Sequence, residues 1–228
     1  MDNNINRLNY IDIHTHNPGA DSEGISVSNL FPEEIVPDVE PFRFYSIGMH
    51  PWLLDPSTDI DEQMNQIELK ATFPNVIAVG ECGFDRMAKT SMEIQGNVFS
   101  GHVMIADKVM KPVFIHCVRA FNELIYYKKK LKPQTPWILH GYSGSYDLAM
   151  QLYKHGFFFS FGKALLNSRS KAIQSFIRLP EESVFLETDE CELMISEIYA
   201  HASGLKNCTI SEIERQLQAN FNKVFLQA

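Results

Sequence analysis

The feature that most constrains this chain is a series of short apolar segments, each leading into a residue that can bind a metal ion. Examples of the segments are TyrIleAspIle at 10–13, ValIleAlaVal at 76–79 and ValPheLeu at 184–186. The residues found where such segments end are His14, His16, Glu81, His116, His140 and Asp189. In a parallel β/α barrel the catalytic groups gather where the strands end. The pattern therefore predicts a barrel fold and a metal-dependent hydrolase.

Length and composition favour one large domain. A chain of 228 residues with 45% hydrophobic residues can bury a full core, and we expect residues 1–228 to form a single barrel domain. The net charge of -8 argues against a protein that coats nucleic acid nonspecifically, because affinity for phosphate backbones rests largely on Lys and Arg. A locally basic cleft stays compatible with this charge.

The sequence also predicts a cytoplasmic protein, with a monomer as the simplest assembly. No apolar stretch approaches the roughly 20 residues that a membrane-spanning helix needs, and the polar start MetAspAsnAsn lacks the apolar core of a signal peptide. The four cysteines form no CxxC pair and suit a reducing compartment. We therefore expect no disulfides and no membrane partner.

Extended and helical segments alternate along the chain, which is typical of an α/β fold with a parallel sheet. Extended segments rich in β-branched or aromatic residues are expected at 10–16, 42–50, 75–81, 113–116, 137–140, 157–161 and 184–187. Helices are expected at 59–73, 92–110, 121–131, 146–155, 168–177 and 211–225. Thr209 with Glu212 predicts a capping box at the start of the last helix.

The region between His16 and Phe42 breaks this alternation. Prolines and glycines interrupt it repeatedly, so no full helix fits there. A short strand at Ile25–Val27 is an alternative, but its link to the first strand is below the dozen or so residues that a parallel crossover usually needs. We therefore expect an α/β fold of the TIM-type (β/α) barrel kind that is distorted or incomplete in its first units.

Two histidines separated by one residue begin the candidate metal site. On a strand with a period of two, His14 and His16 project to the same side and can hold one ion. Glu81 follows a buried segment, and a carboxylate removed from water needs a partner that neutralises it. A divalent cation is one such partner, and an ion pair with a nearby Lys or Arg is the alternative.

Two further histidines have the same placement in consecutive units. His116 and His140 each end an apolar segment, and neutral imidazoles suit an ion such as Zn²⁺. Asp189 completes the pattern as a ligand or a base, with Glu187 one step back in its strand. Asp85 is interpreted as a loop or helix-start residue. Structural or solvent-facing positions are expected for the other histidines, which are His102, His155 and His201.

The order of these motifs resembles the TatD family of metal-dependent hydrolases, in a shortened form, over nearly the whole chain. The motifs are Asp12–His16, Gly48–Pro51, Gly80–Asp85, Pro112–Cys117, His140–Gly144 and Glu187–Asp189. The resemblance implies a site for two divalent ions, Zn²⁺, Mn²⁺ or Mg²⁺, that together activate water and stabilise charge on a phosphate oxygen.

The resemblance also implies a function for each residue. His14 and His16 would hold one ion with Asp189, and the second ion would be held by His116 and His140. Glu81 would bridge the two ions and so take part in catalysis, and Asp189 would also accept the proton of the attacking water. Two residues would bind the substrate, His50 and Arg119, although Arg119 lies three positions after the histidine where the family more often has an arginine at two.

DNA ends or small phosphoesters are the substrates that the resemblance implies, so the leading hypothesis is a TatD-type deoxyribonuclease or phosphodiesterase. The loop after Asp189 is short, and Glu190 and Glu192 would repel a polyanion if they faced the cleft. Two alternatives stay open. One is hydrolysis of an amide or ester, including an aminoacyl ester, by the same chemistry. The other is a catalytically silent metal-binding scaffold.

Overall fold

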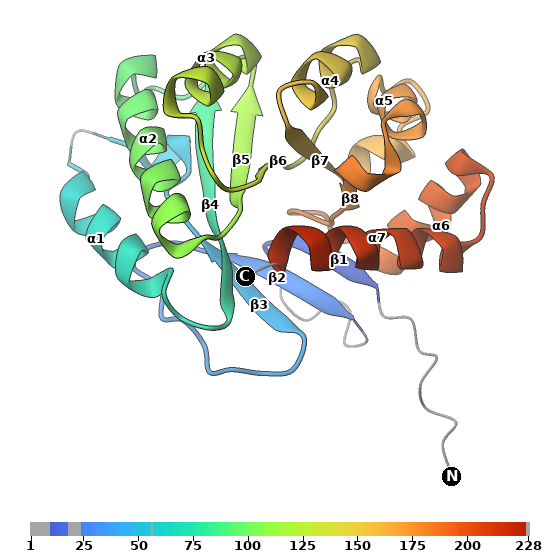
Figure 1. The fold of residues 1–228 in the computed structure, drawn as a ribbon, viewed down its shortest axis with the longest axis horizontal. Coiled ribbons are helices and arrows are strands. Elements are labelled where there is room, and N and C mark those ends of the chain that lie inside the picture. The colour runs from blue at the N-terminus through green and yellow to red at the C-terminus, as the bar shows by residue number, and fades with distance from the viewer. Residues whose placement is uncertain (1–9, 18–23, 56, 227–228) are drawn as a thin grey trace.

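In a computed structural model, eight parallel strands occur in the sheet in the same order as in the chain (Figure 1). The structure describes residues 10–17, 24–55 and 57–226. The strands are β1 (Ile11–Thr15), β2 (Ile25–Leu30), β3 (Arg43–Ile47), β4 (Val76–Asp85), β5 (Val113–Val118), β6 (Trp137–Leu139), β7 (Phe157–Phe161) and β8 (Val184–Leu186). The alternation of apolar segments therefore gives the parallel sheet that the sequence predicted.

The first and last strands meet, and this contact closes the sheet into a barrel. Thr15 of β1 forms an isolated parallel bridge with Asp189, which follows β8. The amide of His16 donates to the carbonyl of Asp189 at 3.0 Å, and the amide of Asp189 donates to the carbonyl of His14 at 2.9 Å. Asp12 reinforces the seam by accepting hydrogen bonds from the backbone and the hydroxyl of Thr188, at 3.0 and 2.5 Å. The prediction of a TIM-type barrel is confirmed.

Helices lie outside the barrel and cover the strands. They are α1 (Ile60–Lys70), α2 (Met92–Val109), α3 (Phe121–Leu131), α4 (Tyr146–Tyr153), α5 (Ala172–Arg178), α6 (Ile195–Lys206) and α7 (Ile210–Phe225). The capping box at Thr209 and Glu212 is present at the start of α7, as predicted. No described helix is both long and apolar enough to cross a bilayer.

Helix α6 was not predicted from the sequence. No helix was expected between the last strand and the last helix, yet Ile195, Ile198, Tyr199 and Ala202 are buried along one face of a helix. That spacing is the apolar stripe of an amphipathic helix. The stripe is short and is followed by Gly204, which weakened the signal in the sequence.

The predicted distortion of the first units is confirmed. Among the described residues between β1 and β3 there is no helix, so the first two connections depart from the β/α pattern. The alternative strand at Ile25–Val27 is real and is longer than expected, because β2 continues to Leu30 and pairs along its length with β3. The barrel therefore has eight strands, although helices cover its first strands incompletely.

Two apolar layers hold the barrel together. The inner layer includes Ile13, Val27, Phe114 and Phe185 from four different strands. Helix α7 adds Phe225 to this layer, and its ring centroid lies 5.9 Å from the ring centroids of both Phe114 and Phe185. The interior of the barrel is thus filled by side chains rather than open, and α7 packs against that filling.

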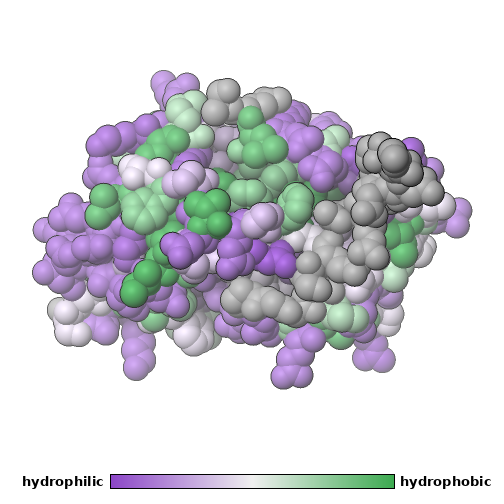
Figure 2. All heavy atoms as spheres, turned by 90° about the horizontal axis from the view of Figure 1, so that it is seen from below, coloured by the Kyte–Doolittle hydropathy of each residue, from purple (hydrophilic) through white to green (hydrophobic). Residues whose placement is uncertain are grey.

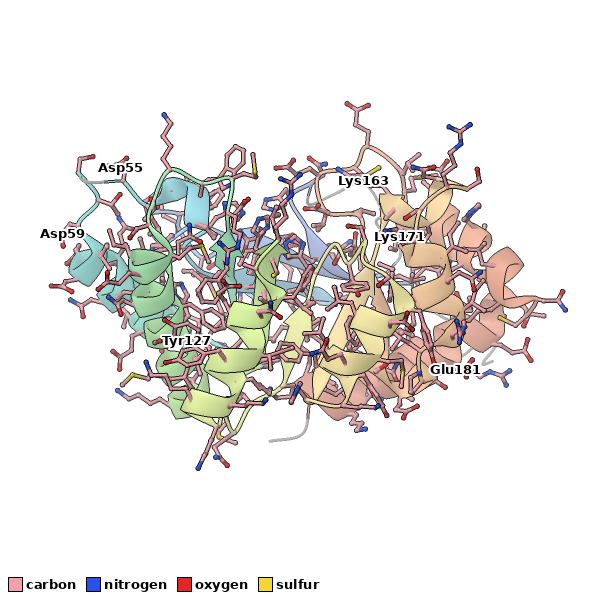
Figure 3. All side chains as sticks on the ribbon, turned by 90° about the horizontal axis from the view of Figure 1, so that it is seen from above. Asp55, Asp59, Tyr127, Lys163, Lys171 and Glu181 are labelled. Carbon is pink, nitrogen blue, oxygen red and sulfur yellow. The ribbon has the colours of Figure 1, made fainter. Side chains whose placement is uncertain are left out.

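The outer layer lies between the strands and the helices. Tyr127 of α3 (Figure 3) packs against Phe84 of β4, with ring centroids 5.2 Å apart. A side chain at Gly96 of α2 would place its Cβ 2.0 Å from the Tyr127 hydroxyl, so a larger residue there would require the Tyr127 ring to move. The face opposite the one in Figure 3 mixes hydrophilic and hydrophobic residues (Figure 2).

Candidate metal centre

Glu81 lies at the centre of the site, inside a strand rather than at its end. The sequence predicted a strand that stops at Glu81, but β4 continues to Asp85 with every residue buried. The register of β4 against β5 shifts between Val79 and Cys82, which is the signature of a bulge. Bulges are common beside active sites because they redirect a side chain. Glycine is required at position 83 by the strand spacing, since a Cβ there would lie 2.1 Å from the carbonyl oxygen of His116.

One oxygen of the Glu81 carboxylate faces β1. Its Oε2 atom lies 3.4 Å from Nε2 of His14 and 3.5 Å from Nε2 of His16. The same two nitrogens lie 3.9 and 3.7 Å from Oδ1 of Asp189. The alternation of side chains along β1 brings both histidines to one side, as predicted, and the closure of the barrel brings Asp189 to meet them.

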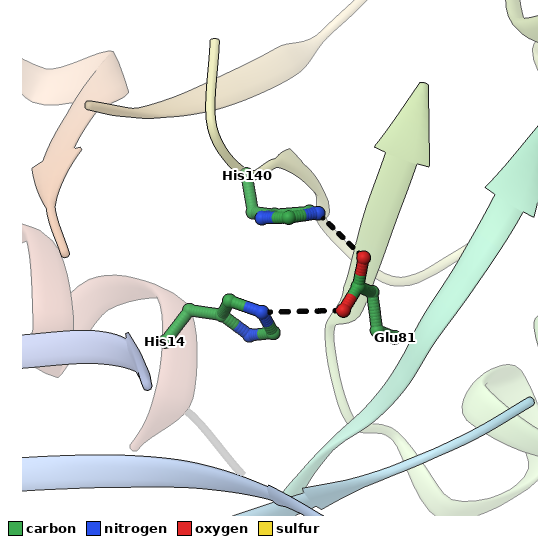
Figure 4. Close-up of side chains that lie close together, drawn as sticks. All are labelled: His14, Glu81 and His140. Atoms are coloured by element: carbon green, nitrogen blue, oxygen red, sulfur yellow. Dashed lines mark ion pairs between the residues drawn. The ribbon is translucent and has the colours of Figure 1, made fainter. Parts of the chain in front are cut away.

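The other oxygen of Glu81 faces β5 and β6. Its Oε1 atom lies 3.0 Å from Nδ1 of His116 and 2.7 Å from Nε2 of His140 (the His14–Glu81–His140 group is drawn in Figure 4). His50, from the turn after β3, also reaches this oxygen, at 3.4 Å from its Nε2. The two oxygens of one carboxylate are thus divided between two groups of imidazoles.

The contacts of His50 fix its tautomer. Its Nδ1 accepts a hydrogen bond from the amide of Trp52 at 3.2 Å. Burial lowers the pKa of His50 to about 4, so the ring is neutral at pH 7 and its proton lies on Nε2. That nitrogen points at Glu81 as a donor, whereas a metal ligand must present an unprotonated nitrogen. In this tautomer His50 presents a hydrogen-bond donor to the site rather than a free nitrogen lone pair.

Charge is balanced by the histidines in this site. Burial by itself would raise the pKa of Glu81, but the charge of His140 and the nearby imidazoles of His116 and His14 hold it well below its usual range. Burial would lower the pKa of His140, and Glu81 and Glu187 raise it well above its usual range. The carboxylate that the sequence placed beside a cation or an ion-pair partner is surrounded by imidazoles instead of Lys or Arg.

Several buried polar atoms of this group fit a metal ion. Both ring nitrogens of His14 are buried and have no hydrogen-bond partner among the described residues. The ligand atoms of His14, Glu81 and His140 lie within 4.8 Å of one another, and so do those of His14, His16 and Asp189. Nitrogen and carboxylate donors in this combination suit Zn²⁺ or Mn²⁺. The donor set at Glu81 therefore fits a divalent cation.

Three residues that support the site were not recognised in the sequence. Asp85, interpreted there as a loop or helix-start residue, ends β4 and lies 3.1 Å from Nε2 of His116. Glu187 is fully buried, 3.7 Å from Nδ1 of His140. The Oδ1 atom of Asn29 in β2 accepts a hydrogen bond of 2.8 Å from the backbone amide of Glu81. The interpretation of Asp85 was wrong because the strand was ended four residues too early.

A cavity of about 580 Å³ opens over these residues. Its lining includes His16, His50, Glu81, Asp85, His116, His140 and Asp189. The other lining residues, here called the rim, are Phe31, Trp52, Leu53, Met87, Val118 and Glu190. The volume is within the roughly 300–1,000 Å³ of small-molecule sites. Arg119, expected to contact a phosphate, is exposed and is not part of this lining. Its guanidinium lies against the sulfur of Met87 at 3.7 Å.

The remaining histidines lie away from the cavity lining, as predicted. His102 of α2 is fully buried, and its Nε2 accepts the amide of Met49 at 3.0 Å while its Nδ1 lies 2.8 Å from the carbonyl of Val98. Its contact with Met49 holds the turn that carries His50. His155 and His201 are partly exposed on the outer side of the barrel.

The chain is similar to known proteins over most of its length. The family described as TatD related DNase matches residues 33–226. An uncharacterised metal-dependent hydrolase of Haemophilus influenzae is 24% identical over 176 residues, which cover 75% of this chain and 64% of that protein. The 3'-5' ssDNA/RNA exonuclease TatD of Musicola paradisiaca is 28% identical over 179 residues, or 75% of this chain and 67% of that protein.

The fold also matches solved structures. The crystal structure of YJJV, a TatD homologue from Escherichia coli K12, matches with a TM-score of 0.81 at 22% identity, covering 96% of this chain and 98% of that one. At this identity the likeness bears on the fold. The matches to three metal-dependent hydrolases known by sequence, from Haemophilus, Buchnera and Bacillus, span 58 to 64% of those proteins.

Proposed function

This chain belongs to the TatD family, and from that premise we propose that it is a divalent-metal-dependent hydrolase that cleaves phosphodiester bonds. The observation that carries the proposal is the division of the Glu81 carboxylate. One oxygen faces His14 and His16, and the other faces His116 and His140. A carboxylate placed in this way is suited to lie between two cations.

The residues sort into two groups on this proposal. His14, His16 and Asp189 would hold one ion, His116 and His140 the other, and Glu81 both. When bound, two close divalent cations supply positive charge that stabilises a phosphodiester transition state and make a water molecule more acidic. The buried and otherwise unpaired nitrogens of His14 support this assignment.

Asp189 is suited to accept the proton of the attacking water. Its carboxylate is partly exposed to the cavity, with 24% of the side chain accessible. Burial raises the pKa of Asp189, which brings a carboxyl closer to the value useful for a general base. The backbone holds it in place at a left-handed φ of 56°, with its amide bonded to His14 of β1 and its carbonyl bonded to the amide of His16.

His50 would bind an oxygen of the scissile phosphate. Its Nε2 proton points into the site, and its other nitrogen is fixed by the Trp52 amide. A neutral donor can approach a phosphate already held by cations without adding charge. DNA ends or small phosphoesters are the substrates proposed, in line with relatives named 3'-5' ssDNA/RNA exonucleases.

The test combines elemental analysis with assays on single-stranded DNA, before and after chelation and metal replacement. Two ions per chain and cleavage restored by metal are the expected results. Asp189→Asn should lose most of the activity, and Glu182→Gln, on the outer side of the barrel, is the control that should not. Binding of two ions without DNA cleavage would redirect the search to small phosphoesters and to amide or ester substrates. Failure to bind any metal would refute the proposal.

A further inference from the structure

We propose that Trp52 is the platform on which the terminal nucleobase of the substrate stacks. This inference deepens the proposed phosphodiesterase function and rests on it. Trp52 lies in the short 3₁₀ helix Pro51–Leu53, directly after His50, and it lines the cavity. The platform would therefore bind a flat heteroaromatic group. The metal-binding residues alone contain no group that would recognise a base.

The indole of Trp52 is held at one edge and free over much of its surface. Its Nε1 donates a hydrogen bond of 2.6 Å to Oδ2 of Asp85, which is only 2% exposed. Trp52 itself is 65% exposed. A large aromatic ring in water gains from being covered, and a ring already fixed in orientation loses little conformational entropy when a ligand covers it. These two properties together are those of a preorganised stacking surface.

The ring is joined directly to the groups that would handle the phosphate. The Trp52 amide donates to Nδ1 of His50, and the two ring centroids lie 6.5 Å apart. The same Oδ2 of Asp85 that accepts the indole N–H also lies 3.1 Å from Nε2 of His116. A base on Trp52 and a phosphate beside His50 are thus neighbouring groups, as they are within one nucleotide.

The other residues of the cavity rim favour a base over a longer phosphate backbone. The rim is apolar at Phe31, Leu53, Met87 and Val118, and none of the described residues that line the cavity is Lys or Arg. Glu190 adds a negative charge. Contacts to a phosphate backbone need cations, whereas stacking on an aromatic ring does not. Recognition should therefore come mainly from one base, with little dependence on sequence.

The kinetic test compares two single-stranded oligonucleotides that differ only in the terminal nucleotide, which is either intact or abasic. Stacking on an aromatic side chain contributes enough binding that the intact substrate should be preferred by roughly 5- to 150-fold in kcat/KM. Trp52→Leu should reduce this preference to about 1, and Trp52→Phe, which keeps a ring, should retain part of it. Tyr126→Leu is the matched control, because Tyr126 is an exposed aromatic residue on α3 outside the cavity.

A binding test does not depend on cleavage. The chain has two tryptophans, and Trp137 is fully buried in the core, so quenching by a ligand should come from Trp52. Titration of the metal-loaded protein with deoxyadenosine monophosphate should quench the fluorescence. Titration with deoxyribose 5-phosphate should not. The quenching should be lost in Trp52→Phe and kept in Tyr126→Leu.

The two tests separate the inference from the function on which it rests. Cleavage with an unchanged base preference in Trp52→Leu would refute the platform and leave the hydrolase. Base-dependent quenching without cleavage of any DNA would refute the proposed function and retain a nucleotide-binding Trp52. Equal binding of an apolar ester and of the nucleotide would show a general apolar site and would overturn the assignment to a nucleobase.

Discussion

Asp85 and His116 lie 3.1 Å apart, on the side of the imidazole ring that faces away from Glu81. Nδ1 of His116 points to Glu81 at 3.0 Å, while Nε2 points to Oδ2 of Asp85. A carboxylate on the far nitrogen keeps the proton there and leaves the near nitrogen free for a metal. Asp85 therefore positions a candidate ligand without being one.

Asp85→Asn should weaken metal binding while leaving the barrel folded. Removing an outer carboxylate of this kind typically lowers metal affinity or activity by roughly 10- to 100-fold. Competition with a Zn²⁺ chelator would measure the change. Asp85 also accepts a hydrogen bond from the indole of Trp52, so the metal affinity of Trp52→Phe should be measured alongside that of Asp85→Asn. An affinity loss of equal size in Trp52→Phe would contradict the positioning of His116 by Asp85.

Glu81→Gln should lower the number of bound ions and the activity together. The amide keeps the shape of the side chain but replaces one oxygen with a donor, so it can no longer face both groups of histidines with negative charge. Elemental analysis and the DNA assay would follow both properties. Glu214→Gln, which alters another buried glutamate on α7, is the control. Unchanged stoichiometry of two ions in Glu81→Gln would contradict its place between them.

His50→Ala should weaken substrate use while the metal content stays at the wild-type value. A hydrogen bond to a charged oxygen is worth about 1.5–3 kcal/mol, so kcat/KM should fall by roughly 10- to 150-fold. Metal analysis of the purified variant supplies the second reading. Loss of one ion together with the activity would instead identify His50 as a ligand.

His102 should make the stability of the fold depend on pH. Burial lowers its pKa to about 4, whereas in the unfolded chain it takes up a proton near its ordinary value of about 6.5. The stabilisation of the folded state by neutral His102 is therefore fully present above pH 6.5 and is lost as the pH falls toward 4. At pH 5 the free energy of unfolding should be lower by about 2 kcal/mol than at pH 7 because of this one group.

Urea unfolding of wild type and His102→Gln, both with chelator, would measure this contribution. The wild type should lose more stability between pH 7 and 5 than the variant does. His155→Gln, which removes a histidine outside this contact, should behave as the wild type. If the free energy of unfolding of the wild type and of His102→Gln changed with pH in the same way, His102 would not be the group responsible for the pH dependence.

Most of the fold, and the gathering of the predicted residues around Glu81, could be predicted because both follow from local patterns. Apolar segments of β-branched and aromatic residues marked the strands, and the alternation along β1 placed His14 and His16 on one side. The pairing of Thr15 with Asp189 could not be read from either segment alone. It follows from the eight-stranded topology, which the sequence indicated only in outline.

The supporting residues were harder to predict because their function depends on contacts between distant segments. Asp85 was interpreted as a loop or helix-start residue, and only the pairing of β4 with β5 shows that the strand continues to it. Asn29 lies in a region broken by prolines and glycines, and its bond to the Glu81 amide joins residues 52 positions apart. The anchoring of Trp52 by Asp85 is of the same kind.

The seam between β1 and Asp189 also determines when the site can exist during synthesis. His14 and His16 leave the ribosome well before their partner across the seam, which is made more than 170 residues later. Until then the early histidines have no closed barrel around them, and loop closure over such a distance is slow. A complete centre is therefore a product of the last stage of folding, and a chain truncated before β8 carries ligands without a site.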